Sequence, residues 1–273
     1  MGNTIGIVGL GKMGRAMIRH LQGAGHRVVG IDPMADAQEQ ARNLGATVLS
    51  TGAEVAAASD IVFIVVGFDA EVERCMFGES GLLAGAKPGL VIAIGSTIAP
   101  SYAFELERRL TGRGIVLLDA PSTRGEKALE AGEILILGGG DKATFDHWTP
   151  VMRTFAADIF HLGTFGAGQV AKMVNNSILW ACMSATDEGL RLGQTLGVDP
   201  EMLRTALHHS SAQNWSMSTR AEERPMPWAE KDMTIVLQEA DSARLSLPLA
   251  GCVKEVIKGY KIRHDIPMPK EVV

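Results

Sequence analysis

The amino-acid sequence predicts an α/β protein in which a doubly wound sheet domain is followed by an all-helical C-terminal domain. Up to about residue 160, short β-branched runs alternate with helical patterns, whereas the rest of the chain shows helical patterns alone. The 273 residues also suit two domains, since a typical domain has about 150. We place the boundary after residue 163, so the expected domains are 1–163 and 164–273.

Six apolar runs in the first domain are predicted to be strands. Their residues are apolar at consecutive positions, which indicates strands buried on both faces, as in a parallel sheet covered by helices on both sides. The runs are Thr4–Val8, Arg27–Ile31, Ile61–Val66, Leu90–Ile94, Ile115–Leu118 and Ile134–Leu137. The helical patterns between them supply the crossovers that parallel strands need.

A long helical pattern begins the second domain. From about Gln169 to Leu196, apolar residues recur three and four positions apart, which predicts a single helix near residues 167–196. No flexible linker is evident, so we expect this helix to join the two domains. Pro200 opens the following helix.

The composition is typical of a soluble globular chain with neither a nucleic-acid nor a membrane partner. Hydrophobic residues make up 46% of the chain and charged residues 21%, and the net charge is −5 with no basic excess in either domain. No apolar run reaches the ~20 residues that span a bilayer, and the first residues lack the features of a signal peptide.

The cysteines and histidines exclude two further classes of site. Cys75, Cys182 and Cys252 are odd in number and far apart, which argues against a disulfide framework and favours a reducing compartment, so we expect a cytoplasmic protein. His208 and His209 are adjacent and do not converge on one ion from a helix, so we expect no metal site.

A glycine-rich loop follows the first predicted strand. It reads Gly9-Leu10-Gly11-Lys12-Met13-Gly14 and opens a predicted helix at 13–24. In a G-x-G-x-x-G loop the first glycine permits a tight turn, the second admits a pyrophosphate, and the third lets helix and strand pack closely. The helix N-terminus adds unpaired N–H groups that favour an anion. The loop therefore predicts a Rossmann-type dinucleotide-binding domain.

Asp32 ends the second predicted strand, where an acidic residue selects between the two nicotinamide cofactors. Its carboxylate can accept hydrogen bonds from the ribose hydroxyls of NAD and repel the 2′-phosphate of NADP, so NAD is expected rather than NADP. Pro33 follows, so an alternative is that Asp32 caps the next helix.

Polar residues interrupt the apolar pattern early in the long helix. Lys172 and Asn176 are four positions apart and share a face. Asn175, Asn176 and Ser177 are poor helix formers, so their presence in a buried segment indicates a role. The residues by themselves leave two roles open, which are a catalytic site or a polar network between the domains with Lys172 extending to solvent.

The sequence resembles the β-hydroxyacid dehydrogenases, the group that includes 3-hydroxyisobutyrate dehydrogenase and tartronate semialdehyde reductase. The resemblance covers nearly the whole chain. Its segments are the Gly9–Gly14 loop, Gly95–Pro100, Asp119–Gly125, the G-x-G-x-x-x-K-x-x-x-N signature from Gly166 to Asn176, and Lys231-Asp232.

The resemblance implies roles for individual residues. It makes Lys172 the catalytic lysine and Asn176 a substrate-orienting amide. It places Val66, Gly67, Thr97 and Lys231 near the cofactor, and Trp215 in the substrate pocket. The family loop reads Asp-x-Pro-Val-Ser-Gly-Gly, whereas this chain has Asp119-Ala120-Pro121-Ser122-Thr123-Arg124-Gly125.

These roles predict an oxidoreductase that transfers a hydride between NAD and a small β-hydroxy acid or its semialdehyde. Lys172 would be the general acid and base, which requires burial or a nearby cation such as Lys231 to favour the neutral amine. Thr123 and the N–H groups of Arg124 and Gly125 would hold the substrate carboxylate. The Arg124 side chain either binds an anionic group directly, which we favour here, or points to solvent.

The sequence leaves two other functions open. An imine reductase shares the expected fold but usually lacks the lysine. A non-catalytic NAD-binding regulator would keep the glycine loop and lose the lysine or the asparagine. Long helices with apolar faces also favour a homodimer or homotetramer.

Overall fold

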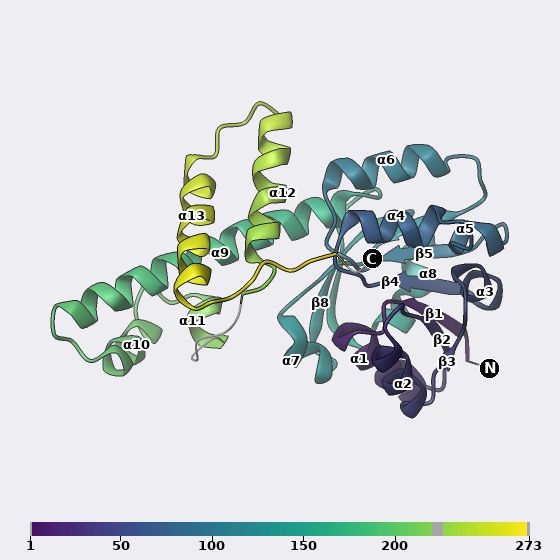
Figure 1. The fold of residues 1–273 in the computed structure, drawn as a ribbon, viewed down its shortest axis with the longest axis horizontal. Helices are drawn as coiled ribbons and strands as arrows, with labels where there is room; N and C mark the ends of the chain where they lie inside the picture. The colour runs from purple at the N-terminus through teal and green to yellow at the C-terminus, as the bar shows by residue number, and fades with distance from the viewer. Residues whose placement is uncertain (1, 220–225, 272–273) are drawn as a thin grey trace. The chain divides into compact units, whose positions relative to one another are not determined.

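The computed structural model describes residues 2–219 and 226–271 (Figure 1). The chain divides into two compact units. The sheet unit extends to Lys172 and includes Glu271, and the helical unit spans Met173–Lys270. The two units are described separately below.

The sheet unit contains a nine-stranded sheet in the order β3-β2-β1-β4-β5-β6-β8-β7, with β9 paired to β8. Strands β1 to β6 are parallel. Their order, 3-2-1-4-5-6, is that of dinucleotide-binding sheets. The strands are β1 Thr4–Val8, β2 Arg27–Ile31, β3 Thr47–Val48, β4 Ile61–Ile64, β5 Val91–Ile94, β6 Val116–Asp119, β7 Ser122–Thr123, β8 Ile134–Gly140 and β9 Ala156–His161.

One predicted strand runs in the opposite direction from that expected. The run at 134–137 became β8, which is antiparallel to β6 and to β7. Ile134 and Ile136 are buried while Leu135 and Leu137 are half-buried, the alternation of an antiparallel strand. Periodicity could not reveal β3 and β7, which have two residues each, or β9, whose residues are mixed in polarity.

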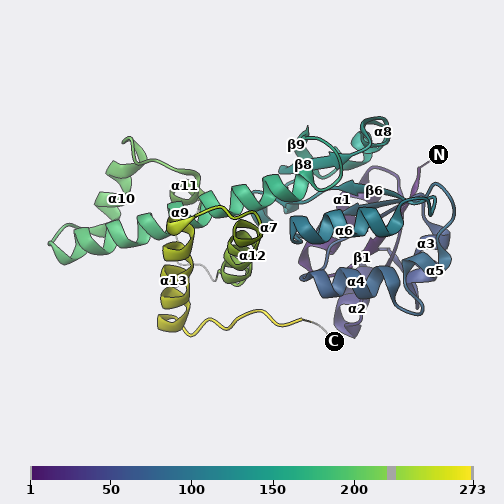
Figure 2. The same cartoon turned by 90° about the horizontal axis from the view of Figure 1, so that it is seen from above.

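Helices cover both faces of the sheet, as the doubly wound class requires (Figures 1 and 2). One hydrophobic core lies under α1, α2, α7 and α8, and the other under α3, α4, α5 and α6. The helices of this unit are α1 Lys12–Gly23, α2 Ala35–Asn43, α3 Gly52–Ala58, α4 Asp69–Phe77, α5 Leu82–Gly85, α6 Pro100–Leu110, α7 Gly125–Glu130 and α8 Lys142–Met152. The fold prediction is confirmed in both its parts, since the remaining described chain is helical.

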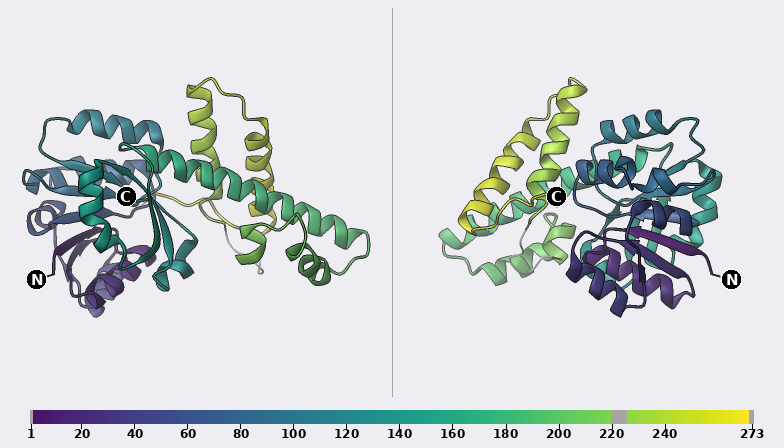
Figure 3. Two further views of the ribbon diagram at one scale, coloured as in Figure 1. Left: turned by 180° about the vertical axis from the view of Figure 1, so that it is seen from behind. Right: turned by 45° about the vertical axis from the view of Figure 1, so that its right-hand side comes forward.

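The helical unit is built on α9, Ala167–Thr195, whose first turns belong to the sheet unit. The other helices are α10 Pro200–His208, α11 Trp215–Thr219, α12 Ala229–Ser242 and α13 Pro248–Arg263. α12 and α13 lie side by side and share a core with the middle of α9 (Figures 1 and 3). No described helix is long and apolar enough to cross a membrane. The domain boundary after residue 163 stays a prediction, while the compact units divide later, within α9.

Candidate active site

The glycine loop has a different steric requirement at each glycine. Gly9 has a φ of +96°, and a Cβ there would collide with the carbonyl oxygen of Val65. A Cβ on Gly14 would collide with the carbonyl oxygen of Gly9, so this glycine lets α1 pack against the loop. Gly11, the N-cap of α1, has no heavy atom within 4 Å of its Cβ position. The open side of Gly11 therefore leaves room for a phosphate group beside the helix N-terminus.

The three non-glycine residues of the loop differ in what they can offer to a ligand. The Leu10 side chain is fully buried, so Leu10 can offer its backbone alone. Lys12 is exposed and its amine lies 3.1 Å from a carboxylate oxygen of Glu126. Met13 packs against the core on the α1 side of the sheet.

Asp32 links the glycine loop to the end of β2. Its Oδ2 accepts a 2.7 Å hydrogen bond from the N–H of Leu10, and its Oδ1 accepts a 2.8 Å bond from the N–H of Met34. Met34, not Asp32, is the N-cap of α2, so Asp32 is not the cap that the alternative interpretation expected. Each carboxylate oxygen retains a lone pair, so ribose hydroxyls can still bind.

The other predicted cofactor residues of this unit follow β4 and β5. The N–H of Val66 donates to Ser96 Oγ at 2.8 Å, and the N–H of Gly67 donates to Glu71 Oε2 at 2.6 Å. Thr97 comes directly after Ser96. Ligands of parallel α/β sheets bind outside the carboxyl ends of the strands. The glycine loop, Val66-Gly67 and Thr97 all lie at this edge of the sheet.

The predicted carboxylate loop has a left-handed backbone at Arg124, where its sequence differs from the family pattern. Arg124 has a φ of +81°, in the left-handed region that glycine adopts more readily. Its guanidinium lies 2.6 Å from Asp158 Oδ2 and donates to the carbonyl oxygen of Glu133 at 3.0 Å. The side chain is thus turned to neighbouring protein groups and is not directed to solvent. Gly125, with a φ of +80°, begins α7 and has open space at its Cβ position.

Lys172 lies beside this loop. Its amine donates a 2.7 Å hydrogen bond to the carbonyl oxygen of Ser122, the residue before Thr123. The glycines of its signature have a steric cause. Gly166 has a φ of +96°, and a Cβ on Gly168 would collide with the carbonyl oxygen of Leu137. The signature therefore lets α9 begin tightly against the sheet with Lys172 near the loop.

Three predicted site residues belong to the helical unit. Asn176 is buried, and its side-chain oxygen accepts a 3.0 Å hydrogen bond from the amide of Asn175. The Lys231 amine lies 5.7 Å from the centre of the Trp228 ring. Trp215 begins α11 and is 53% exposed, which leaves its ring accessible in this unit.

Two buried polar groups were missed by sequence reasoning as parts of the site. Asp119, which ends β6, is completely buried, and burial raises the pKa of its carboxyl to about 7. Gln169, in the first turn of α9, is completely buried as well. A polar residue at the end of an apolar strand and one inside an apolar helical segment were the available signals. In the helical unit, Trp180 Nε1 donates to Asp232 Oδ2 at 2.9 Å and so anchors the residue beside Lys231.

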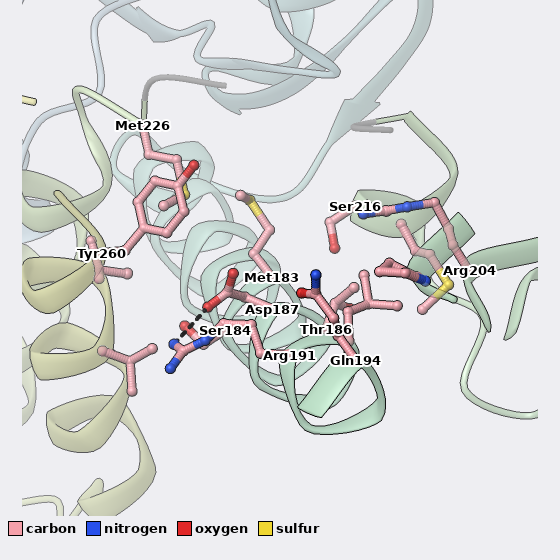
Figure 4. Close-up of a pocket in the computed structure, with 15 residues that line it drawn as sticks. Met183, Ser184, Thr186, Asp187, Arg191, Gln194, Arg204, Ser216, Met226 and Tyr260 are labelled. Carbon is pink, nitrogen blue, oxygen red and sulfur yellow. Dashed lines mark ion pairs between the residues drawn. The ribbon is translucent and has the colours of Figure 1, made fainter. Parts of the chain in front are cut away.

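A cavity of about 210 Å³ lies in the helical unit (Figure 4). Asp187 faces Arg191 from the preceding turn of α9, with Tyr260 near one end and Arg204 near the other. None of the predicted site residues lines this cavity. No group of three or more potential metal ligands occurs among the described residues.

Comparison with known proteins agrees with both parts of the fold. Residues 4–163 match the family described as the NAD binding domain of 6-phosphogluconate dehydrogenase. Residues 166–263 match the family described as NAD-binding of NADP-dependent 3-hydroxyisobutyrate dehydrogenase.

Individual relatives are similar over most of their length. The 2-(hydroxymethyl)glutarate dehydrogenase of Eubacterium barkeri is 31% identical, over 93% of this chain and 88% of the relative. The 3-hydroxyisobutyrate dehydrogenase of Pseudomonas aeruginosa is 32% identical, over 92% and 90%. A structure of Mycobacterium tuberculosis 3-hydroxyisobutyrate dehydrogenase with L-serine has a TM-score of 0.86 at 28% identity, covering 98% and 97%. An imine reductase from Myxococcus stipitatus, at 18% identity, shares the fold.

A dinucleotide-binding sheet unit, a helical unit and these relatives define an NAD(P)-dependent oxidoreductase that acts on the hydroxyl group of hydroxy acids. The chain belongs to the β-hydroxyacid dehydrogenase family. The predicted resemblance is confirmed, and the hydroxy-acid reaction fits the relatives better than imine reduction does. The predicted cytoplasmic location stays a prediction.

Proposed function

We propose that this chain oxidises a small β-hydroxy acid with NAD, or reduces the corresponding semialdehyde, using Lys172 as the proton carrier. The observation that carries this proposal is the 2.7 Å contact between the Lys172 amine and Ser122. It joins the one lysine of the family signature to the loop that offers Thr123 and backbone N–H groups.

The chemistry that bound NAD would supply is that of a hydride acceptor for the carbon that bears the hydroxyl group. The open face of Gly11 and the N–H groups at the start of α1 hold its pyrophosphate. Asp32 accepts the ribose hydroxyls with its remaining lone pairs and disfavours a 2′-phosphate by charge repulsion. Val66, Gly67 and Thr97 would contact the cofactor from the ends of β4 and β5.

Lys172 takes the hydroxyl proton during oxidation and returns it to the carbonyl oxygen during reduction. The protonated amine also stabilises negative charge that develops on that oxygen. The Asn176 amide orients the substrate by bonding its carboxylate and hydroxyl groups. The side chain of Thr123 and the N–H groups of Arg124 and Gly125 bind the carboxylate.

Arg124 contributes to this site through its backbone, which modifies the role favoured from sequence. Its guanidinium has partners in Asp158 and in the carbonyl of Glu133, so moving it to a substrate anion would break a 2.6 Å ion pair. The left-handed backbone at Arg124 directs the N–H groups of the loop in the way that a glycine would. The carboxylate is therefore bound without help from the Arg124 side chain.

The substrate class follows from what related proteins have in common. The curated names include 3-hydroxyisobutyrate and 2-hydroxy-3-oxopropionate, and one solved relative holds L-serine. Each of these molecules is a short acid with an oxygen function on the β-carbon. A loop that binds one carboxylate beside one lysine suits this class.

A homodimer or homotetramer is part of the proposal. In α10, all of whose residues are described, no residue is buried, and Met202 is 73% exposed. Ile178 and Leu192 on α9 and Leu196 just after it are also exposed. Apolar helix faces of this kind are stabilised by contact with a second copy. Light scattering after size-exclusion chromatography measures the oligomeric state, and a monomer at micromolar concentration would contradict this part.

The activity is tested with a panel of about twenty hydroxy acids and semialdehydes. Purified protein is mixed with each compound and with NAD or NADH, and the absorbance of reduced nicotinamide is followed. Turnover with a β-hydroxy acid that Lys172→Met lacks supports the proposal. Turnover confined to imines, or no binding of NADH, would contradict it.

A further inference from the structure

Two completely buried polar side chains fasten the first turn of α9 to the sheet. Asp119 lies at the end of β6, and Gln169 lies three residues before Lys172. Burying a carboxyl or an amide is strongly unfavourable unless hydrogen bonds compensate for the lost hydration. Their bonding partners therefore show what these residues hold in place.

The Asp119 carboxylate binds the backbone at the start of α9. Its Oδ2 accepts hydrogen bonds from the N–H groups of Gly166 at 2.5 Å and Gly168 at 3.0 Å. Its Oδ1 has no hydrogen-bond partner among the described residues. Asp119 is also the first residue of the segment that leads to Ser122. One side chain thus fixes the helix start to the loop that Lys172 contacts.

The Gln169 amide binds the segment around Thr97. Its Nε2 donates to the carbonyl oxygen of Ser96 at 3.0 Å, and its Oε1 accepts from the N–H of Ile98 at 3.1 Å. These are the peptide groups on either side of Thr97. Because Ser96 Oγ accepts the N–H of Val66, the link extends to the segment after β4.

Gln169 and Lys172 are three positions apart and share a face of α9. The helix start is therefore held at three points, by Asp119 at Gly166 and Gly168, by Gln169 in the first turn, and by Lys172 at Ser122. At the first two points the chain buries a polar side chain completely. Apolar side chains could hold a helix against the sheet without the cost of burying polar groups.

We propose that Asp119 and Gln169 are positioning residues that fix the Lys172 amine relative to the Thr97 segment and the carboxylate loop. This inference rests on the proposed role of Lys172. Neither residue touches substrate or transfers a proton. Both act through the placement of α9, and an error of about 1 Å in such placement can cost about 10² in rate.

The decisive experiment is a double-mutant cycle between Gln169→Met and Lys172→Met. Methionine keeps the length of the side chain and removes both amide bonds. We expect Gln169→Met to lower kcat by about tenfold or more, with KM for the acid and the NADH dissociation constant within about threefold of wild type. In the Lys172→Met background the same change should leave the residual rate nearly unaltered, since the lysine it places is gone.

Asp119 is tested with a conservative pair. Asp119→Asn keeps an oxygen that can accept from Gly166 and Gly168, so its kcat should stay within about threefold of wild type at neutral pH. Asp119→Ala removes the acceptor, and kcat should fall by about tenfold or more. Gln194→Met, on the exposed far end of α9, is the matched control and should behave as wild type.

The outcomes separate the inference from the function on which it rests. NADH fluorescence and thermal melting show whether each variant folds. If Gln169→Met does not fold, Gln169→Asn takes its place, because it keeps an amide that is too short to bond both peptide groups. Equal losses from the Gln169 change in both backgrounds, or unchanged kcat in Gln169→Met and Asp119→Ala, would overturn the positioning role. A fully active Lys172→Met would overturn the proposed function itself, and the inference with it.

Discussion

The amine of Lys172 donates a 2.7 Å hydrogen bond to the carbonyl oxygen of Ser122, 50 residues earlier in the chain. Thr123 and Arg124 follow Ser122, so a carboxylate bound by that loop lies beside the amine. Both partners belong to the sheet unit. The proposed proton carrier and the proposed carboxylate loop are therefore joined within one compact body.

Lys172→Met should lower kcat by at least about 10², because the variant lacks the group that accepts or donates the proton. The dissociation constant of NADH should be nearly unchanged, since the glycine loop is untouched. Steady-state kinetics and NADH fluorescence measure the two quantities. Lys142→Met, at an exposed lysine of α8, is the control. If Lys172→Met turns over substrate as fast as wild type, Lys172 is not the proton carrier and its role is structural.

Asp32→Ser should lower the ratio of kcat/KM with NAD to kcat/KM with NADP by roughly tenfold or more, because repulsion of the 2′-phosphate is lost. Asp32→Asn keeps an acceptor for the N–H of Leu10 and removes the charge, so it should lower the ratio as well. The kcat/KM values with both cofactors decide the matter. If the wild-type enzyme prefers NADP, Asp32 does not select the cofactor, and its role is the hydrogen bond to the glycine loop.

Gly11→Ala and Gly14→Ala should fail in different ways. A Cβ on Gly11 meets open space, so the melting temperature of the free protein should change little while NAD affinity falls about tenfold. A Cβ on Gly14 collides with the carbonyl of Gly9, so this variant should lose about 1–3 kcal/mol of stability. Thermal melts and NADH titrations distinguish the two. Equal destabilisation by both substitutions would mean that Gly11 does not face a ligand site.

Arg124→Gly should leave the ratio of KM for an acid to KM for its methyl ester within about threefold of wild type. The guanidinium is paired with Asp158, so under the proposed function the substrate carboxylate binds without it. Glycine also relieves the left-handed backbone, worth about 1–2 kcal/mol, while the partly exposed ion pair contributes about 0–1 kcal/mol, so stability should hold or rise. A tenfold increase in KM for the acid, with KM for the ester unchanged, would show that the guanidinium binds the substrate carboxylate.

Asp119 should make stability fall as pH rises from about 4 to 7. Burial, with a smaller effect from the charge of Glu107, raises the folded-state pKa to about 7, whereas an unfolded aspartate titrates near 3.9. The folded state therefore holds a proton that the unfolded state releases in this range. The effect is about 4 kcal/mol at most. Asp119→Asn has no such proton, so its melting temperature relative to wild type should rise between pH 4.5 and 7.5, and a constant difference would contradict the raised pKa.

Local patterns determined much of this protein in advance. Apolar runs at Thr4–Val8 and Arg27–Ile31 became β1 and β2 with the predicted bounds, because a buried parallel strand needs a continuous apolar run. The glycine loop could be predicted from the sequence because the steric reason for each glycine lies in a short, recognisable motif. The long helix α9 was readable because its apolar period extends over many turns.

Long-range contacts were decided by tertiary structure. The antiparallel direction of β8 depends on its pairing with β6, which no residue of β8 encodes alone. Asp119 and Gln169 meet partners 47 and 71 residues away, at Gly166 and Ile98. Arg124, the N-cap of α7, pairs with Asp158 on β9. Sequence periodicity reports which face of an element is apolar, because that depends on neighbours one turn or one pleat away. It does not report which distant polar groups share a buried position, because the folded chain alone brings them together.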